Sequence, residues 1–183
     1  MGVFVGIDVS LENSAVCAVD EHGKLLKETK VASDPGALNA CIRSMPGVVE
    51  AIGIEAGPLS QWLHKSLTDL GLPVVLMETR QVKAALKAAP VKTDRRDAAG
   101  LARLLQMGWF RPVHCKSLSA QELRVLLGAR RSVQDAAINI EMSIRGMLRN
   151  FGLRLGRIGK VSFEDRVREL TEGNKLIQLS IEP

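Results

Sequence analysis

Short strand-like segments separated by turns dominate the first 77 residues, and they constrain the fold more than any other feature of the chain. The pattern of residues 2–9 predicts a buried strand. Residues 13–19 and 24–31 predict two more strands, with a turn at Asp20–Gly23 between them. We therefore expect a three-stranded antiparallel meander at the start of the chain.

Strands and helices alternate after this meander. Ser33-Asp34-Pro35 predicts a helix start, because a capping side chain is followed by a proline that fits the first turn. The expected elements are a helix from there to Gly47, a strand over 48–54, a helix from Pro58 to Gly71, a strand over 72–77 and a helix around 79–88 that breaks at Pro90. This order predicts an α/β fold, a mixed sheet with helices on its faces.

Four acidic residues lie in three short stretches, GIDVS, GIEAG and KTDRRDA: Asp8, Glu55, Asp94 and Asp97. Asp8 lies near the carboxyl end of the first strand, and Glu55 lies just past the end of the fourth. In open α/β sheets these ends form the crevice where ligands bind. Asp94 and Asp97 open a helix that runs to about Met107, and residues three apart share a helix face. We expect the four carboxylates to meet if the two strands are neighbours.

A cluster of carboxylates suits hard cations such as Mg²⁺ or Mn²⁺. Two such ions about 3.5–4 Å apart can assist both the attacking and the leaving oxygen of a phosphodiester displacement. Each acid also has a simpler interpretation. Asp8 and Glu55 would suit a strand end or the approach to a helix, and Asp94 and Asp97 would suit a helix N-terminus that needs no metal. At this point both interpretations stay open.

Positive charge is concentrated in the second half of the chain. Residues 1–90 carry eight Lys or Arg and ten Asp or Glu, whereas residues 91–183 carry seventeen and ten. This asymmetry favours contact with a polyanion, and a solvated helical surface is the alternative. With no Tyr, four Phe and two Trp, nucleic acid would be contacted through its backbone rather than by base stacking. The candidate side chains are Arg124, Arg130, Arg131, Arg145, Arg149, Arg154 and Arg157.

A long helical pattern runs from Ser119 to about Asn150. Its apolar positions step by three and four residues, which predicts a coiled coil, formed either as a helical hairpin or as a dimer seam. A single amphipathic helix packed on the first domain is the alternative. The series is Leu123, Leu126, Arg130, Val133, Ala137, Ile140, Ile144, Met147 and Phe151.

The remaining segments complete the expected domain organisation. A mobile basic loop is expected over 151–160 and a short helix over 163–170, followed by a polar tail without a regular pattern. The predicted domains are 1–110, a coiled-coil segment over 117–151, and a basic loop with the tail over 152–183. No apolar run approaches the roughly 18–20 residues of a membrane span, so we expect a cytoplasmic protein. Cys17, Cys41 and Cys115 lack metal-ligand spacing and are expected to be reduced thiols.

GIDVS, IEAG, the WLHKSL helix and KTDRRDA together resemble the amino-terminal domain of DEDD transposases. These are the recombinases of insertion sequences guided by a bridge RNA, and the Piv-type DNA invertases are their relatives. The resemblance covers roughly residues 3–170 and includes the basic segment ELRVLLGARR to IRGMLRNFGLRLG. One departure is Glu78-Thr79, where many members have Asn-Pro, and we expect it to lie away from the metal site.

The resemblance implies a RuvC-like, ribonuclease-H-type fold in which Asp8, Glu55, Asp94 and Asp97 are catalytic and bind Mg²⁺ or Mn²⁺. It also implies DNA and a structured guide RNA as partners, a homodimer or higher homo-oligomer, and no membrane. A carboxyl-terminal domain supplies a serine nucleophile in such recombinases. We expect this chain to contain only the part before it.

Three other functions remain possible from the sequence. A self-sufficient RuvC-like nuclease, such as a junction resolvase, needs the same four acids without a second domain. A sugar-kinase or actin-type ATPase can begin with a GIDVS-like stretch, but its further phosphate loop and adenosine motif are not found in this sequence. A non-catalytic nucleic-acid-binding or dimerisation module would use the acids structurally.

Overall fold

The computed structural model describes residues 1–87 and 94–181. The chain forms two compact units, which we call the sheet unit (Met1–Ser117) and the helical unit (Leu118–Pro183). The expected helix break at Pro90 lies outside the described residues. No helix in the described part of the chain is long and apolar enough to cross a membrane.

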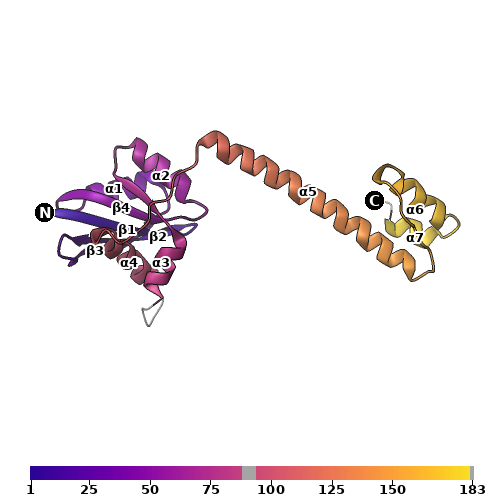
Figure 1. Cartoon of the computed structure of the whole chain (residues 1–183), viewed down its shortest axis with the longest axis horizontal. Helices are drawn as coiled ribbons and strands as arrows, with labels where there is room; N and C mark the ends of the chain where they lie inside the picture. The colour runs from indigo at the N-terminus through magenta and orange to yellow at the C-terminus, as the bar shows by residue number, and fades with distance from the viewer. Residues whose placement is uncertain (88–93, 182–183) are drawn as a thin grey trace. The chain divides into compact units, whose positions relative to one another are not determined.

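The sheet unit contains a five-stranded sheet in the order β3-β2-β1-β4-β5, with four helices packed against it (Figure 1). Strands β1, β2 and β3 form the expected antiparallel meander, and β4 and β5 continue the sheet parallel to β1. The strands are β1 (Gly2–Asp8), β2 (Asn13–Asp20), β3 (Leu25–Ala32), β4 (Val48–Glu55) and β5 (Val74–Met77). The helices are α1 (Pro35–Arg43), α2 (Ser60–Asp69), α3 (Thr79–Leu86) and α4 (Asp94–Gln106). The predicted mixed α/β sheet is therefore confirmed.

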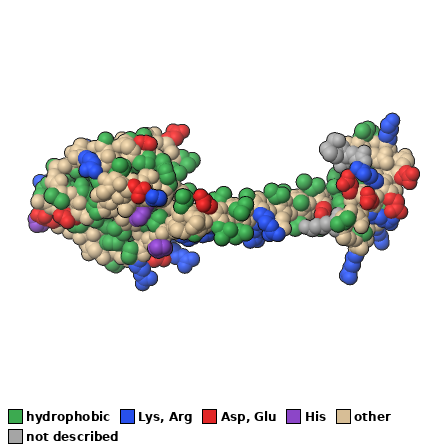
Figure 2. Space-filling view, turned by 90° about the horizontal axis from the view of Figure 1, so that it is seen from above, with side chains coloured by type: hydrophobic (Ala, Val, Ile, Leu, Met, Phe, Trp, Pro, Cys, Tyr) green, Lys and Arg blue, Asp and Glu red, His purple; other side chains and the backbone are tan. Residues whose placement is uncertain are grey.

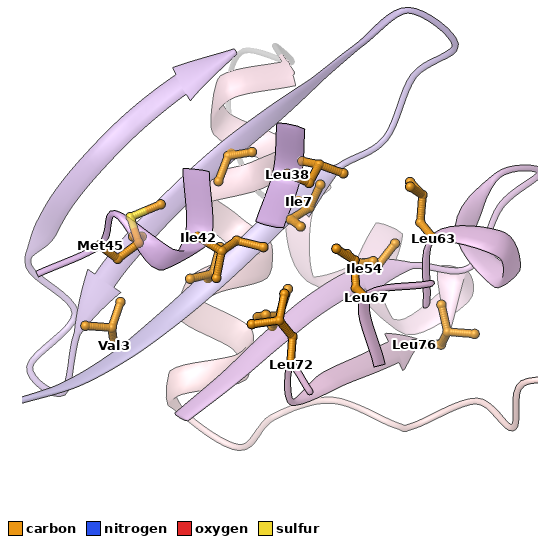
Figure 3. Packing of buried hydrophobic residues seen from close by; sticks show 14 residues of the cluster. Val3, Ile7, Leu38, Ile42, Met45, Ile54, Leu63, Leu67, Leu72 and Leu76 are labelled. Carbon is orange, nitrogen blue, oxygen red and sulfur yellow. The ribbon is translucent and has the colours of Figure 1, made fainter. Parts of the chain in front are cut away.

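Side chains alternate between the two faces of the sheet, as the strand period of two requires. On one face, apolar residues of β1, β4 and β5 pack against α1 and α2. Figure 3 shows this core, in which Ile7 and Ile54 of the strands meet Leu38 of α1 and Leu63 of α2. On the other face, Met77 and its neighbours pack against α3 and α4. The sheet is thus covered on both sides.

Local signals set several element boundaries in the sheet unit. Asp34 caps α1 as expected, because one carboxylate oxygen accepts hydrogen bonds from the backbone N–H groups of Gly36 and Ala37 at 2.9 and 3.0 Å. Several predicted limits were wrong by one to a few residues: for example, α1 ends at Arg43, α2 begins at Ser60, and β5 begins at Val74. Such shifts are normal at element ends, which fray.

The segment after α4 lies along the outer edge of β5. The backbone N–H of Glu78 donates to the Arg111 carbonyl at 3.0 Å, and that of Val113 donates to the Leu76 carbonyl at 2.8 Å. Pro112 bridges to Met77 between these bonds. The segment expected to be a connector therefore also covers an edge strand, which protects it from pairing with other chains.

The helical unit begins with α5 (Leu118–Arg149), a single continuous helix as the sequence predicts. A short 3₁₀ helix, η1 (Lys160–Ser162), and the helices α6 (Phe163–Thr171) and α7 (Lys175–Ile181) follow. The polar tail, in which the sequence shows no regular pattern, contains α7. Ile177 of α7 packs against a small core of Leu148, Leu155 and Val167, and this docking stabilises a helix too short to form alone.

All three cysteines are free thiols, as expected. Cys17 lies on β2 beneath α4, and burial raises the pKa of its thiol to about 11. The reactive thiolate form of Cys17 is therefore rare at neutral pH, which favours a structural role for this residue.

Helix α4 lies directly on β1 because Gly6 has no side chain. A Cβ atom at Gly6 would lie 2.1 Å from the Ala98 carbonyl oxygen and 2.5 Å from the Ala102 nitrogen, both backbone atoms. At Gly100 of α4 the nearest atom can move more easily. A Cβ there would lie 2.2 Å from Leu86 Cδ2, which is the end of a flexible side chain.

We expect Gly6→Ala to lower the free energy of unfolding of the sheet unit by about 3 kcal/mol, because the helix backbone must move to admit the methyl group. Urea unfolding followed by tryptophan fluorescence measures this, since the chain's two Trp residues, Trp62 and Trp109, both lie in the sheet unit. Gly100→Ala is the control and should change stability by less than about 1 kcal/mol, because alanine favours the helix. Equal effects of the two variants would contradict this account.

Candidate carboxylate site

Asp8 and Glu55 lie side by side at the ends of two parallel strands. The register pairs Ile7 of β1 with Ile54 of β4, so the next residue of each strand is an acid. Ile7 and Ile54 point into the core with α1 and α2. By strand alternation, Asp8 and Glu55 point to the face that α4 covers. The neighbouring strands that the sequence analysis required are therefore present.

Asp97 lies in the first helical turn of α4, directly before the buried Ala98. The close contact of Ala98 with Gly6 of β1 places this turn near the carboxyl end of the strand. Asp8, Glu55 and Asp97 line one open pocket of about 480 Å³. The side chain of Asp94 lies outside the described part of the structure. Its place on the same helix face as Asp97 stays a prediction.

Two loops and one helix complete this pocket. They contribute residues that follow β1 and β4 and the exposed face of α3: Val9, Ser10, Leu11, Ala56, Gly57, Pro58, Leu59, Ser60, Thr79 and Lys83. Thr79 and Lys83 were not among the candidate residues predicted from the sequence. Their spacing of four residues on a helix directly after a strand end was the available signal.

Hydrogen bonds hold the loop that follows Glu55. The Thr79 hydroxyl donates to the Ala56 carbonyl at 2.7 Å. The buried Ser60 hydroxyl accepts from the Gly57 N–H at 2.9 Å and donates to the Gly57 carbonyl at 2.7 Å. Thr79 of the Glu78-Thr79 pair therefore lines the pocket and donates a hydrogen bond to its wall, and its separation from a metal ion stays a prediction.

The pocket offers carboxylate oxygens as ligands and the positively charged side chain of Lys83. Carboxylates are the donors that Mg²⁺ and Mn²⁺ prefer. Among the residues whose side chains are described, no three His, Cys, Asp or Glu groups are arranged to hold a metal ion. Ionised carboxylates that share a pocket repel one another, and a divalent cation between them would remove this repulsion. The carboxylate donors of this pocket are therefore of the type that fits a divalent ion.

Lys83 supplies a positive charge at this pocket. It lies on the exposed side of α3, one helical turn after Thr79. An ammonium group here would attract an anionic substrate and offset part of the repulsion among the carboxylates. The pocket thus combines groups suited to a metal ion with a group suited to a phosphate.

The seven candidate nucleic-acid-binding arginines all lie in the helical unit, and the structure brings three of them together. Arg145, Arg149 and Arg154 line a hollow of about 300 Å³. Arg131 instead forms an ion pair with Asp135 at 3.7 Å, an exposed contact along α5. Arg124 and Arg130 lie further toward the start of α5, and Arg157 is exposed in the loop before η1.

The chain matches the DEDD transposase family of the IS110 type, described as transposase, over residues 5–152. The chain belongs to this transposase family. A curated relative is the transposase for insertion sequence element IS1111A of Coxiella burnetii, which is 26% identical over 167 residues. That match covers 88% of this chain and 43% of the relative. The chain spans less than half the length of the curated relatives that it matches, 43% and 42%.

Solved structures with partial similarity include RuvC of Thermus thermophilus in complex with a Holliday junction substrate. It is 21% identical with a TM-score of 0.44, and the match covers 62% of this chain and 100% of RuvC. A ROK hexokinase from Thermus thermophilus is 23% identical with a TM-score of 0.37, covering 46% of this chain and 36% of the hexokinase. The predicted transposase relationship is confirmed at the level of the family, whereas the guide RNA and the metal ligands stay predictions.

We expect Ser60→Ala to lower the free energy of unfolding of the sheet unit by about 2 kcal/mol, because it leaves the Gly57 N–H beside the pocket without its acceptor. Urea unfolding followed by tryptophan fluorescence is the measurement. Ser66→Ala, on the same helix and less deeply buried, is the control and should change stability by less than about 0.5 kcal/mol. An equally small effect at Ser60 would show that this loop does not depend on the hydroxyl.

Proposed function

We propose that this chain is the metal-binding part of a DNA transposase that cuts and rejoins DNA under the guidance of a structured RNA. One observation carries the proposal: acids from three separate stretches of sequence, Asp8, Glu55 and Asp97, line the same pocket. If each acid served only as a local cap or turn residue, there would be no reason for all three to line the same pocket. Membership of the transposase family supports the same chemistry.

In this proposal Asp8, Glu55, Asp94 and Asp97 hold Mg²⁺ or Mn²⁺. When bound, such ions activate the attacking oxygen and stabilise the leaving oxygen of a phosphodiester displacement. The chain's own residues orient the substrate. Lys83 would contact a phosphate oxygen, and the loop held by Thr79 and Ser60 would form the wall against which the nucleic acid lies.

A thermal-melt titration with Mn²⁺ tests the metal site. Because a ligand that binds only the folded state stabilises it by RT ln(1 + [L]/Kd), we expect a gain of about 2.7 kcal/mol at a hundredfold excess over Kd. Glu55→Gln and Asp97→Asn should each abolish most of this gain without unfolding the protein. Tryptophan fluorescence again reports the sheet unit alone.

Glu50→Gln is the matched control, because Glu50 is an exposed acid on the same strand as Glu55 and does not line the pocket. It should keep the full response to Mn²⁺. If Mn²⁺ stabilises none of these proteins even with DNA present, the acids are caps and turns, and a non-catalytic binding module is the better proposal. Cleavage of branched DNA by this chain alone would favour a self-sufficient nuclease.

We also propose that α5 forms a coiled coil with a second copy of this chain. In the described part of the helical unit, α6 and α7 cover α5 near Ile144 and Leu148 and leave the apolar series exposed toward its N-terminus. Figure 2 shows apolar side chains in green along α5 beside Lys and Arg side chains in blue. Val133 is 70% exposed and Leu126 is 65% exposed. A parallel or antiparallel partner helix would bury this stripe.

Sedimentation velocity tests the dimer. We expect wild type to sediment as a dimer at micromolar concentration and Val133→Glu to sediment as a monomer, because a charge on the seam is not tolerated. Val125→Glu is the control: Val125 is 72% exposed on the same helix but lies off the three-and-four series. A monomeric wild type, or equal loss in both variants, would contradict the proposal.

A further inference from the structure

Three arginines surround one hollow where α5 ends. Its lining consists of Arg145, Arg149, Leu153, Arg154, Leu155 and Gly156, and its volume is about 300 Å³. Half of these residues carry a positive charge, and the others are apolar. This hollow belongs to the helical unit and is distinct from the carboxylate pocket of the sheet unit.

The fold builds this hollow by reversing the chain after α5. Arg145 and Arg149 are four residues apart and share a helix face. Beyond them Gly152 adopts a positive φ of 77°, and the Leu153 N–H donates to the Leu148 carbonyl at 3.1 Å, as in a helix C-cap. The chain then turns back past the end of the helix and brings Arg154 to the side chains of α5.

The burial of Leu155 fixes the position of the loop segment that follows α5. Leu155 is 5% exposed and packs with Leu148 and Val167, and its neighbour Leu153 packs against the same core. Arg154 lies between these two anchored leucines and is itself exposed. The position of Arg154 beside Arg149 therefore follows from core packing rather than from chance contacts of a free loop.

Arg145 is held in place before any ligand arrives. Its Nη1 donates to the Gly156 carbonyl at 2.9 Å, and its guanidinium carbon lies 5.2 Å from the centre of the Phe163 ring. A guanidinium has five N–H donors, so further donors are available to an anion. Because the side chain is already ordered, binding an anion costs less conformational entropy.

Three acidic residues of the described helical unit form ion pairs with arginines that do not line the hollow. The ion pairs there are Arg131–Asp135, Arg166–Glu169 and Arg168–Glu164. None of them involves Arg145, Arg149 or Arg154. Three positive charges that converge without a carboxylate among the described residues favour an anionic ligand, and guanidinium groups bind phosphate oxygens in pairs.

We propose that this hollow is a phosphate site that binds one phosphodiester group of a nucleic-acid backbone. The proposal rests on the nucleic-acid partner proposed above and adds the atoms that hold it. The lining offers guanidinium groups, which bind phosphate oxygens in pairs, and aliphatic side chains. Because a phosphodiester group is the same at every nucleotide, a contact to it carries no sequence information and fixes the position of the backbone at the end of α5.

Fluorescence anisotropy of the full chain with a labelled DNA duplex, measured over a range of salt concentrations, tests the site. Each loss of one phosphate contact should weaken binding about tenfold at low salt and reduce the slope of log K against log salt by about 1. We expect this for Arg149→Gln and for Arg154→Gln. Both side chains are exposed, so the substitutions should leave the circular-dichroism melt unchanged.

Lys175→Gln is the matched control, because it removes one exposed positive charge from the same unit away from the hollow. It should weaken binding less than twofold. If wild type binds the duplex but the arginine variants behave like Lys175→Gln, the phosphate site is wrong and the nucleic-acid partner stands. If wild type binds neither the duplex nor a structured RNA, both proposals fail.

Calorimetric titration with inorganic phosphate separates the two sources of a phosphate group. Weak binding of inorganic phosphate that disappears in Arg154→Gln, together with the loss of duplex affinity, supports the backbone assignment. Tight binding of inorganic phosphate that depends on Arg154, with duplex affinity unchanged, would overturn it and assign the hollow to free phosphate.

Discussion

The direct contact between the backbones of α4 and β1 is the constraint on which the rest of the sheet unit depends. At Gly6 the strand offers no side chain, so the helix approaches until Ala98 and Ala102 touch the sheet. Any larger residue would move the helix outward. The contact both completes the core on this face and sets how far Asp97 lies from Asp8 and Glu55. A substitution at Gly6 would therefore change both the stability of the sheet unit and the geometry of the site, although Gly6 has no side chain that could take part in the chemistry.

The carboxylate pocket balances opposing electrostatic demands. When ionised, the carboxylates of Asp8, Glu55 and Asp97 would repel one another, yet the sheet and α4 bring them to one pocket. A divalent cation would remove this conflict, and Lys83 would reduce it.

The helical unit has a different physical basis. Its core is small, built around Leu148, Leu155 and Val167, and many apolar side chains of α5 are exposed. A small core stabilises a unit only slightly, so an apolar stripe of this length favours stabilisation by a partner helix. The basic hollow lies at the one end of α5 that this core does fix. Along α5, the arginines of the basic hollow thus lie near the C-terminal end, and the exposed apolar side chains lie toward the N-terminal end.

Features that depend on local backbone preferences could be predicted from the sequence. The antiparallel meander, the cap at Asp34 and the unbroken α5 follow from periodicity, turns and capping, which act over a few residues. The positions of Asp8 and Glu55 at strand ends were also predictable, because strand ends are locally marked. The two acids lie close together only because β1 pairs with β4, and the sequence did not establish that pairing.

Features that depend on contacts between distant segments were decided only by the tertiary structure. Thr79 reaches the site through a hydrogen bond to Ala56, and α7 is helical because Ile177 docks on a core built elsewhere. The convergence of Arg145, Arg149 and Arg154 likewise requires the chain to reverse after α5. The sequence by itself determined the strands and helices that carry strong local signals, and it placed acids and bases near their ends. The tertiary structure decided which of these groups meet, because packing between remote side chains leaves no local signal.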